Sequence, residues 1–244
     1  MASMSTLGHT HWRASPPACG GALRFPERPT QSSISSPRLT GNDGWSALGN
    51  TKAAGINAML RWIEATKGKP MVARIFDELP LEQRKLLSVK VFDNEWVDDR
   101  VAVALIQAID RVLGAGDGAY FRLVGRVVAR ETLRGIYRIF LKLAGMDVVV
   151  RRANSIWRAY FDTGRFEIVE VGKGFARVRL LDYPPYSTTC PGIMGWIDVI
   201  YEFYGLDGTI VHPSCRRTGA EFCEFHQTWK AATGPRETRD PDRP

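Results

Sequence analysis

The sequence predicts an α+β fold in which a helical region precedes an antiparallel sheet. Apolar residues recur at helical spacing in several stretches between Lys52 and Tyr160. Alternating residues then predict two strands, a helix and a final two-stranded hairpin that contains cysteines. Runs of helices followed by strands with short connections favour an α+β protein with an antiparallel sheet. The predicted order in the second half is strand–strand–helix–strand–strand.

The two ends of the chain have the composition of disordered segments. Residues 1–50 and 231–244 are rich in Ser, Thr, Pro, Gly or charged residues, and their apolar residues show no period. We therefore expect a single folded ligand-binding domain over residues 51–230. The N-terminal segment contains three residues of metal-ligand type to which we assign no metal role: His9, His11 and Cys19.

Composition excludes several classes of protein. The chain has 244 residues and 44% hydrophobic content, enough to form a sizeable core. No apolar run approaches the roughly 18 residues that cross a bilayer, and the N-terminus lacks the apolar stretch of a signal peptide. We therefore expect a cytoplasmic protein with reduced thiols. The net charge of +7 is too small to favour nucleic acid as a specific partner.

The helical region is predicted from apolar spacing and from residues that begin or end helices. Asp98 is a good N-cap, and the glycines after Leu113 end the helix that it begins. The predicted elements are a helix that contains Ile56, Leu60 and Ile63, short helices Met71–Leu79 and Leu81–Leu87, an extended segment Lys90–Trp96, and helix Val101–Leu113.

Five arginines recur at intervals of four along the next helical stretches, Ala119–Ala129 and Thr132–Leu143. On a helix of 3.6 residues per turn they form a slowly drifting stripe on one face. The favoured interpretation is a solvated face opposite the core, and the alternative is contact with phosphate, an acidic lipid surface or a partner protein. The stripe consists of Arg122, Arg126, Arg130, Arg134 and Arg138.

The second half begins with one more predicted helix and then changes to strands. Residues Gly172–Gly174 predict a turn between two antiparallel strands. The predicted elements are helix Val148–Tyr160, strands Phe166–Val171 and Phe175–Leu181, an amphipathic helix Gly192–Tyr204, and hairpin strands Thr209–Cys215 and Glu221–Trp229.

The final hairpin contains a candidate metal site. A turn at Gly219 would bring Cys215 and Cys223 together, and Cys190 and His212 complete a tetrahedral zinc ligand set. For His212 to reach the cysteines the strand must bend, and Pro213 makes a regular strand unfavourable there. Buried structural thiols and a disulfide remain alternatives. A catalytic pair of Cys190 with either His212 or His226 is a further alternative.

The spacing His-x-x-Cys-x-x-x-Gly-x-x-x-Cys-x-Phe resembles the end of the vinyl-4-reductase small-molecule-binding domain. Relatives of that family include sensor domains of phenol-responsive bacterial activators, in which an acidic residue stands where this chain has His212. The resemblance implies a structural zinc held by Cys190, His212, Cys215 and Cys223. It also implies a small-molecule pocket.

Aromatic residues near the junction of the two halves are candidates for that pocket. The sequence contains no nucleotide-binding glycine motif and no Gly-x-Ser-x-Gly elbow. Heme is disfavoured, because no histidine lies between residues 52 and 150. The predicted ligand-binding residues are Trp157, Tyr160, Phe161, Phe166, Met194, Trp196 and Tyr201.

The sequence therefore predicts a non-enzymatic sensor or regulatory domain for an apolar or aromatic ligand, with a structural zinc. It would signal as a homodimer or through a regulatory protein partner. The alternatives are a tetrapyrrole vinyl reductase or its accessory factor, and an assembly subunit that binds an acyl chain.

Overall fold

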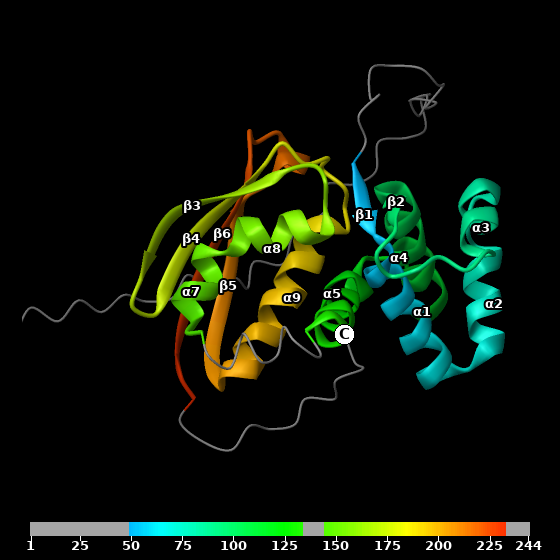
Figure 1. Ribbon diagram of the computed structural model, residues 1–244, viewed down its shortest axis with the longest axis horizontal. Coiled ribbons are helices and arrows are strands. Elements are labelled where there is room, and N and C mark those ends of the chain that lie inside the picture. The colour runs from blue at the N-terminus through cyan, green and yellow to red at the C-terminus, as the bar shows by residue number, and fades with distance from the viewer. Residues whose placement is uncertain (1–48, 134–143, 233–244) are drawn as a thin grey trace, which may run out of the picture. The chain divides into compact units, whose positions relative to one another are not determined.

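The computed structural model describes residues 49–133 and 144–232. Helices dominate the first half, and a four-stranded antiparallel sheet dominates the second (Figure 1). The predicted α+β class is therefore confirmed. Most of residues 1–50 and 231–244 lie outside the described residues, although Asn50 and Ala231 belong to strands. Among the described helices, none is both long and apolar enough to cross a bilayer.

The helical region packs around its own apolar core. Asp98 caps helix α4, because its side chain accepts a hydrogen bond of 2.8 Å from the backbone N–H of Arg100. The segment predicted as extended, Lys90–Trp96, is irregular until Trp96, where a short strand pairs with one that the sequence did not predict. The elements are β1 (Asn50–Lys52), α1 (Ala53–Lys67), α2 (Lys69–Asp77), α3 (Leu81–Leu87), β2 (Trp96–Asp98), α4 (Asp99–Leu113) and α5 (Ala119–Thr132).

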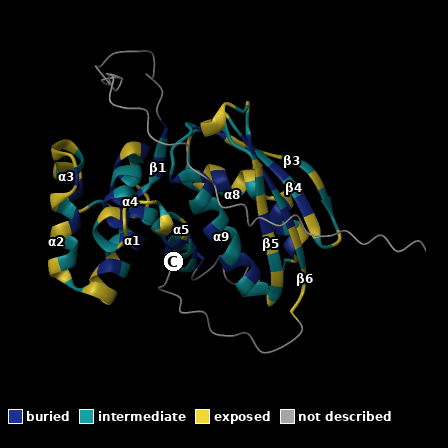
Figure 2. Cartoon of the chain, turned by 180° about the vertical axis from the view of Figure 1, so that it is seen from behind, coloured by how far each residue is buried: buried dark blue, intermediate teal, exposed yellow. Residues whose placement is uncertain are grey.

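The second half forms a sheet of order β3-β4-β6-β5, in which all neighbours are antiparallel. The sheet region has a second apolar core of its own. Alternate residues of β4 are buried, so one face of this strand packs on this second core (Figure 2). The predicted helix Val148–Tyr160 is two helices that divide at Arg152. The elements are α7 (Met146–Arg151), α8 (Ala153–Tyr160), β3 (Arg165–Gly172), β4 (Phe175–Leu181), α9 (Thr189–Tyr204), β5 (Leu206–Ser214), the 3₁₀ turn Arg216–Thr218 and β6 (Cys223–Ala231).

Helices α5 and α9 join the two halves through an unusually close contact. A Cβ atom at Gly195 of α9 would lie 2.0 Å from the backbone oxygen of Arg122 on α5. A Cβ atom at Gly125 of α5 would lie 2.1 Å from the backbone oxygen of Gly192. Only glycine permits this approach, since any larger residue would push the two helices apart.

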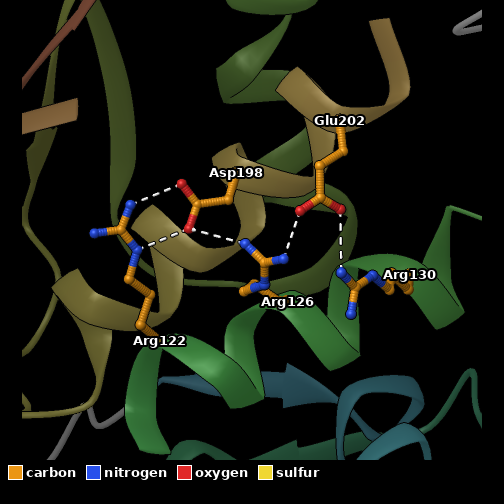
Figure 3. A network of polar contacts seen from close by, with 5 residues as sticks. All are labelled: Arg122, Arg126, Arg130, Asp198 and Glu202. Carbon is orange, nitrogen blue, oxygen red and sulfur yellow. Dashed lines mark hydrogen bonds and ion pairs between the residues drawn. The ribbon is translucent and has the colours of Figure 1, made fainter. Parts of the chain in front are cut away.

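The arginine stripe lies along this same contact. Arg122 donates two hydrogen bonds of 2.7 Å to Asp198 (Figure 3). Arg126 binds Asp198 and Glu202, and Arg130 binds Glu202. The favoured interpretation of a solvated face is therefore wrong for Arg126 and Arg130, whose side chains are 16% and 30% exposed and bind carboxylates of α9, whereas the Arg122 side chain is 45% exposed. Arg134 and Arg138 lie outside the described residues.

Candidate functional site

A cavity of about 250 Å³ lies between the core of the helical region and the core of the sheet region. Helices α1, α4 and α5 contribute residues to its wall, and so do α7, α8, α9 and the sheet. Its main aliphatic lining residues are Ile56, Met59, Ile106, Val124, Val128, Val150, Ile156, Ile193, Ile197 and Ile200. Apolar walls with few polar groups are typical of small-molecule sites.

The structure places most of the predicted ligand-binding aromatics on this wall. The residues that line it are Trp157, Tyr160, Phe161, Phe166 and Trp196. Met194 and Tyr201 are not among the lining residues. Tyr201 is buried, and its hydroxyl lies 3.4 Å from Oε1 of Gln227. Met194 packs against the second core.

Trp157 is at the centre of an aromatic group at one part of the wall. Its ring stacks on Phe161 with centroids 4.0 Å apart, and its edge contacts with Phe166 and Tyr183 are at 5.3 and 4.9 Å. Its indole N–H donates a 2.8 Å hydrogen bond to the backbone oxygen of Thr163. These contacts hold the ring in one orientation, as a preformed site requires.

Two polar lining residues were missed by sequence reasoning. Asp99 is the first residue of α4 and Tyr183 follows strand β4. Burial raises the pKa of Asp99 to about 6, and the nearby Tyr183 hydroxyl acts in the opposite direction. The sequence offered no signal for either, because an acidic residue in the first turn is ordinary at a helix N-terminus.

The four predicted metal ligands form a compact cluster at the start of α9 and the β5–β6 hairpin. The ligand atoms of Cys190, His212, Cys215 and Cys223 all lie within 4.8 Å of one another. Cys190 is the second residue of α9, and Cys223 is the first residue of β6. The pairing of β5 with β6 shifts register between Val211 and Ser214, which is the bend that brings His212 to the cysteines.

The side chains of the cluster are in a state that allows them to bind a metal ion. All three cysteines are free thiols, and Nε2 of His212 is buried without a hydrogen-bond partner among the described residues. A hydrogen bond between the two thiols lowers the pKa of Cys223 and raises that of Cys190. The backbone N–H of Arg216 also points at Sγ of Cys223, at 3.4 Å. One thiolate is therefore favoured within the cluster.

Comparison with known proteins identifies the architecture. No family model matches the sequence, and no curated protein matches it either. Among solved structures, an H-NOX protein from S. oneidensis in the Fe(II) ligation state has a TM-score of 0.60 at 12% identity, over 75% of this chain and 97% of that chain. The chain has the H-NOX fold.

Other solved structures give the same result. An Fe(II) unliganded H-NOX mutant from K. algicida has a TM-score of 0.60 at 12% identity, over 73% of this chain and 96% of that chain. A structure from a study of heme distortion in the H-NOX family has a TM-score of 0.53 at 12% identity, over 77% of this chain and the whole of that one.

These comparisons correct two predictions. The resemblance to the vinyl-4-reductase domain and the phenol sensors is wrong, because the structural neighbours are H-NOX domains. The prediction of a structural zinc is overturned with it, because these neighbours are described with heme and Fe(II) rather than with zinc. A short cysteine spacing was insufficient to identify a family.

The described lining of the cavity lacks the histidine that most often holds heme iron. Heme iron requires an axial histidine, cysteinate, methionine or tyrosinate, and the described lining contains no histidine or cysteine, although Met59 and Met146 belong to it. His212 lies in the cysteine cluster, and His226 binds Glu224 at 2.7 Å. The pKa of Tyr183 is raised well above its usual value by burial, which opposes a tyrosinate. The chain therefore has the H-NOX fold, but no described residue on the cavity wall is a histidine that could bind heme iron.

Proposed function

We propose that this chain is a non-enzymatic sensor domain whose cavity binds a small apolar or aromatic molecule in place of heme. The observation that supports this most directly is the apolar cavity of about 250 Å³, with a wall drawn from both cores. An engineered protein cavity of roughly 150 Å³ is large enough to bind benzene. A one-ring or two-ring molecule therefore suits the volume seen here.

Ligand binding at this position would be coupled to the packing of the two halves. Gly125 and Gly192 line the cavity and also form the close contact between α5 and α9. A bound molecule therefore touches the same helices that join the helical region to the sheet region. A shift of that contact would be read by a regulatory partner protein or by a second copy of the chain.

The test is thermal denaturation with a panel of one-ring and two-ring hydrocarbons, together with hemin titration. We expect saturable stabilisation by hydrocarbons, because a ligand that binds only the folded state raises its melting temperature. Val150→Phe should abolish the effect by filling the cavity, since Val150 is 4% exposed and lines the wall. Val211→Phe is the matched control, because Val211 lies on β5 with 55% exposure.

Two results would refute the proposal. One is purified protein that contains stoichiometric heme with the absorption spectrum of a ligated iron. The other is hydrocarbon stabilisation that is equal in Val150→Phe, Val211→Phe and the unmodified protein, which would place binding outside the cavity.

A second proposal concerns the cysteine cluster. The four ligand atoms within 4.8 Å of one another favour a single thiophilic transition-metal ion bound by Cys190, His212, Cys215 and Cys223. Thiolate and imidazole select such ions over magnesium and calcium. This site is separate from the cavity, since none of its four residues lines the wall.

Elemental analysis of protein purified without chelator tests the second proposal, followed by cobalt substitution. We expect one ion per chain and the absorption of tetrahedral cobalt–thiolate. His212→Ala should shift the cobalt spectrum, because it removes the nitrogen ligand. A metal-free protein that does not take up cobalt would contradict the proposal, and an unchanged spectrum in His212→Ala would remove the histidine from the ligand set.

A further inference from the structure

Among the described residues, the cavity wall contains one carboxylate, and no positive charge balances it. Asp99 is 1% exposed and lines the cavity. No described cation pairs with its carboxylate, whose oxygens make no hydrogen bond of regular geometry, and the neutral hydroxyl of the nearby Tyr183 does not balance the charge. Buried carboxylates are normally paired or hydrogen-bonded, because desolvation of the unpaired charge is costly. An unpaired one on the wall of a cavity indicates a partner that comes from the ligand.

The cationic side chains nearby are engaged elsewhere. Lys52 is the one cationic residue in the described lining, and its ammonium group donates to the backbone oxygen of Asn94 and lies over the ring of Trp96. Arg100 follows Asp99 in sequence, but its guanidinium binds both oxygens of Asp98. Neither group neutralises the Asp99 carboxylate.

The surroundings of Asp99 also favour a positive charge. Asp98 on β2 and Asp162 after α8 both raise the pKa of Asp99 through their negative charges, in addition to the larger effect of burial. The two tyrosine hydroxyls close to it belong to Tyr183 and Tyr186, and the negative charge of Asp99 raises the pKa of both. Asp99 and Tyr183 line the cavity here, and the nearby charges of Asp98 and Asp162 add to the negative potential at the Asp99 carboxylate.

We propose that the ligand of this cavity is a small apolar amine whose ammonium group binds Asp99. The inference rests on the proposed function, since it specifies the chemistry of a molecule in the same cavity. The ammonium group would donate a charge-assisted hydrogen bond to the carboxylate, and the hydrocarbon part would occupy the apolar wall. Asp99 is then the residue that determines specificity for an amine over a hydrocarbon.

The aromatic group is suitably placed to complete such a site. Tyr183 interacts with Asp99, and its ring makes an edge contact with Trp157 at 4.9 Å. Trp157 stacks on Phe161, and both residues line the cavity. Aromatic faces next to a carboxylate attract an organic cation, since the ring quadrupole adds to the ion pair.

The experiment compares benzylamine with ethylbenzene, which has the same shape but no charge. Calorimetric titration of the full chain at pH 7.5 should give an affinity for benzylamine that is about tenfold to a hundredfold higher, as expected for a buried charge-assisted hydrogen bond. Asp99→Asn should reduce that preference to within about threefold while ethylbenzene binding remains. Asp207→Asn is the matched control, because Asp207 lies on β5, away from the cavity wall.

The pH dependence of the unmodified protein gives a second measurement that needs no variant. Burial raises the pKa of Asp99 to about 6, so benzylamine should bind more weakly as pH falls from 7.5 to 5 and the carboxylate gains a proton. Ethylbenzene affinity should not fall over the same range.

The outcomes distinguish the two proposals. Equal affinity for the two probes, or a preference for benzylamine that survives in Asp99→Asn, overturns the amine inference and leaves the apolar cavity function standing. Ethylbenzene binding with no benzylamine binding has the same consequence. Failure of both probes to bind overturns the cavity function, and the amine inference with it.

Discussion

The cysteine cluster and the apolar cavity are two candidate sites on the same helix, α9, but they are assembled in opposite ways. Three of the four cluster residues lie between His212 and Cys223, within one hairpin. The cavity wall, by contrast, takes residues from Thr51 to Gln227. A site made by local spacing is visible in a sequence, whereas a site made by the meeting of distant elements is not.

The two sites also differ in how they depend on single residues. Each of the cluster's four side chains supplies one ligand atom, so the loss of one changes the whole site. The cavity depends on many apolar contacts and on the helix contact that sets its width. We therefore expect abrupt effects in the cluster and graded effects at the cavity.

The largest expected effect is in the cluster. If the cluster holds the proposed metal ion, Cys223→Ser should remove it and lower the free energy of unfolding by about 4 kcal/mol, because a ligand at the start of β6 is lost. Chemical denaturation with parallel elemental analysis measures both quantities. Cys19→Ser is the control and should change neither. If Cys223→Ser keeps full metal content and stability, the cluster is not a cooperative site.

The next effect is at the helix contact beside the cavity. Gly195→Ala should cost about 3 kcal/mol, because its methyl group would lie 2.0 Å from the backbone oxygen of Arg122. Gly192→Ala is the matched control, since its methyl group would meet nothing within 4 Å. Urea denaturation compares the two. Equal stability of both variants would mean that the close approach of α5 and α9 does not set the cavity.

A smaller loss of stability is expected when the arginines of the α5–α9 contact are replaced, and its size should differ between Arg126 and Arg122. Arg126 is 16% exposed and Arg122 is 45% exposed, although both bind Asp198. Arg126→Ala should cost about 2 kcal/mol, because it leaves two carboxylates without a largely buried partner. Arg122→Ala should cost less than about 1 kcal/mol, as for exposed ion pairs. The reverse order in thermal denaturation would show that burial does not govern these contacts.

An effect that depends on pH concerns the wall carboxylate in the absence of ligand. The pKa of Asp99 rises from 3.8 to about 6 in the folded state, mainly through burial. The folded state therefore holds the proton more tightly, and stability from this group is lost as pH rises from about 4 to about 6. Asp99→Asn should thus be about 3 kcal/mol more stable than the unmodified protein at pH 8, and most of the difference should disappear by pH 4.

Denaturation curves from pH 4 to 8 measure this difference. A constant difference across the range, or a variant that is less stable at pH 8, would mean that Asp99 has a partner in the folded protein.

Sequence reasoning succeeded where the information is local. The period of apolar residues predicted the α+β class, and Asp98 was predicted as the cap of the helix that it begins. It was wrong where the environment of a helix face depends on which other element packs against it. The arginine stripe was assigned to solvent, because a helix sequence does not show which element supplies Asp198 and Glu202. The family resemblance failed for the same reason, since a short hairpin spacing says little about the rest of the fold.

By itself, the sequence determined the α+β class, the N-cap at Asp98 and the spacing that brings His212, Cys215 and Cys223 to one hairpin. These features depend on neighbouring residues, whose positions are restricted by helix and strand geometry. Only the tertiary structure decided that α5 meets α9, that the meeting leaves a cavity, and that Asp99 lies unpaired on its wall. Those features depend on contacts between residues far apart in the chain, and periodicity does not specify which surfaces pack together.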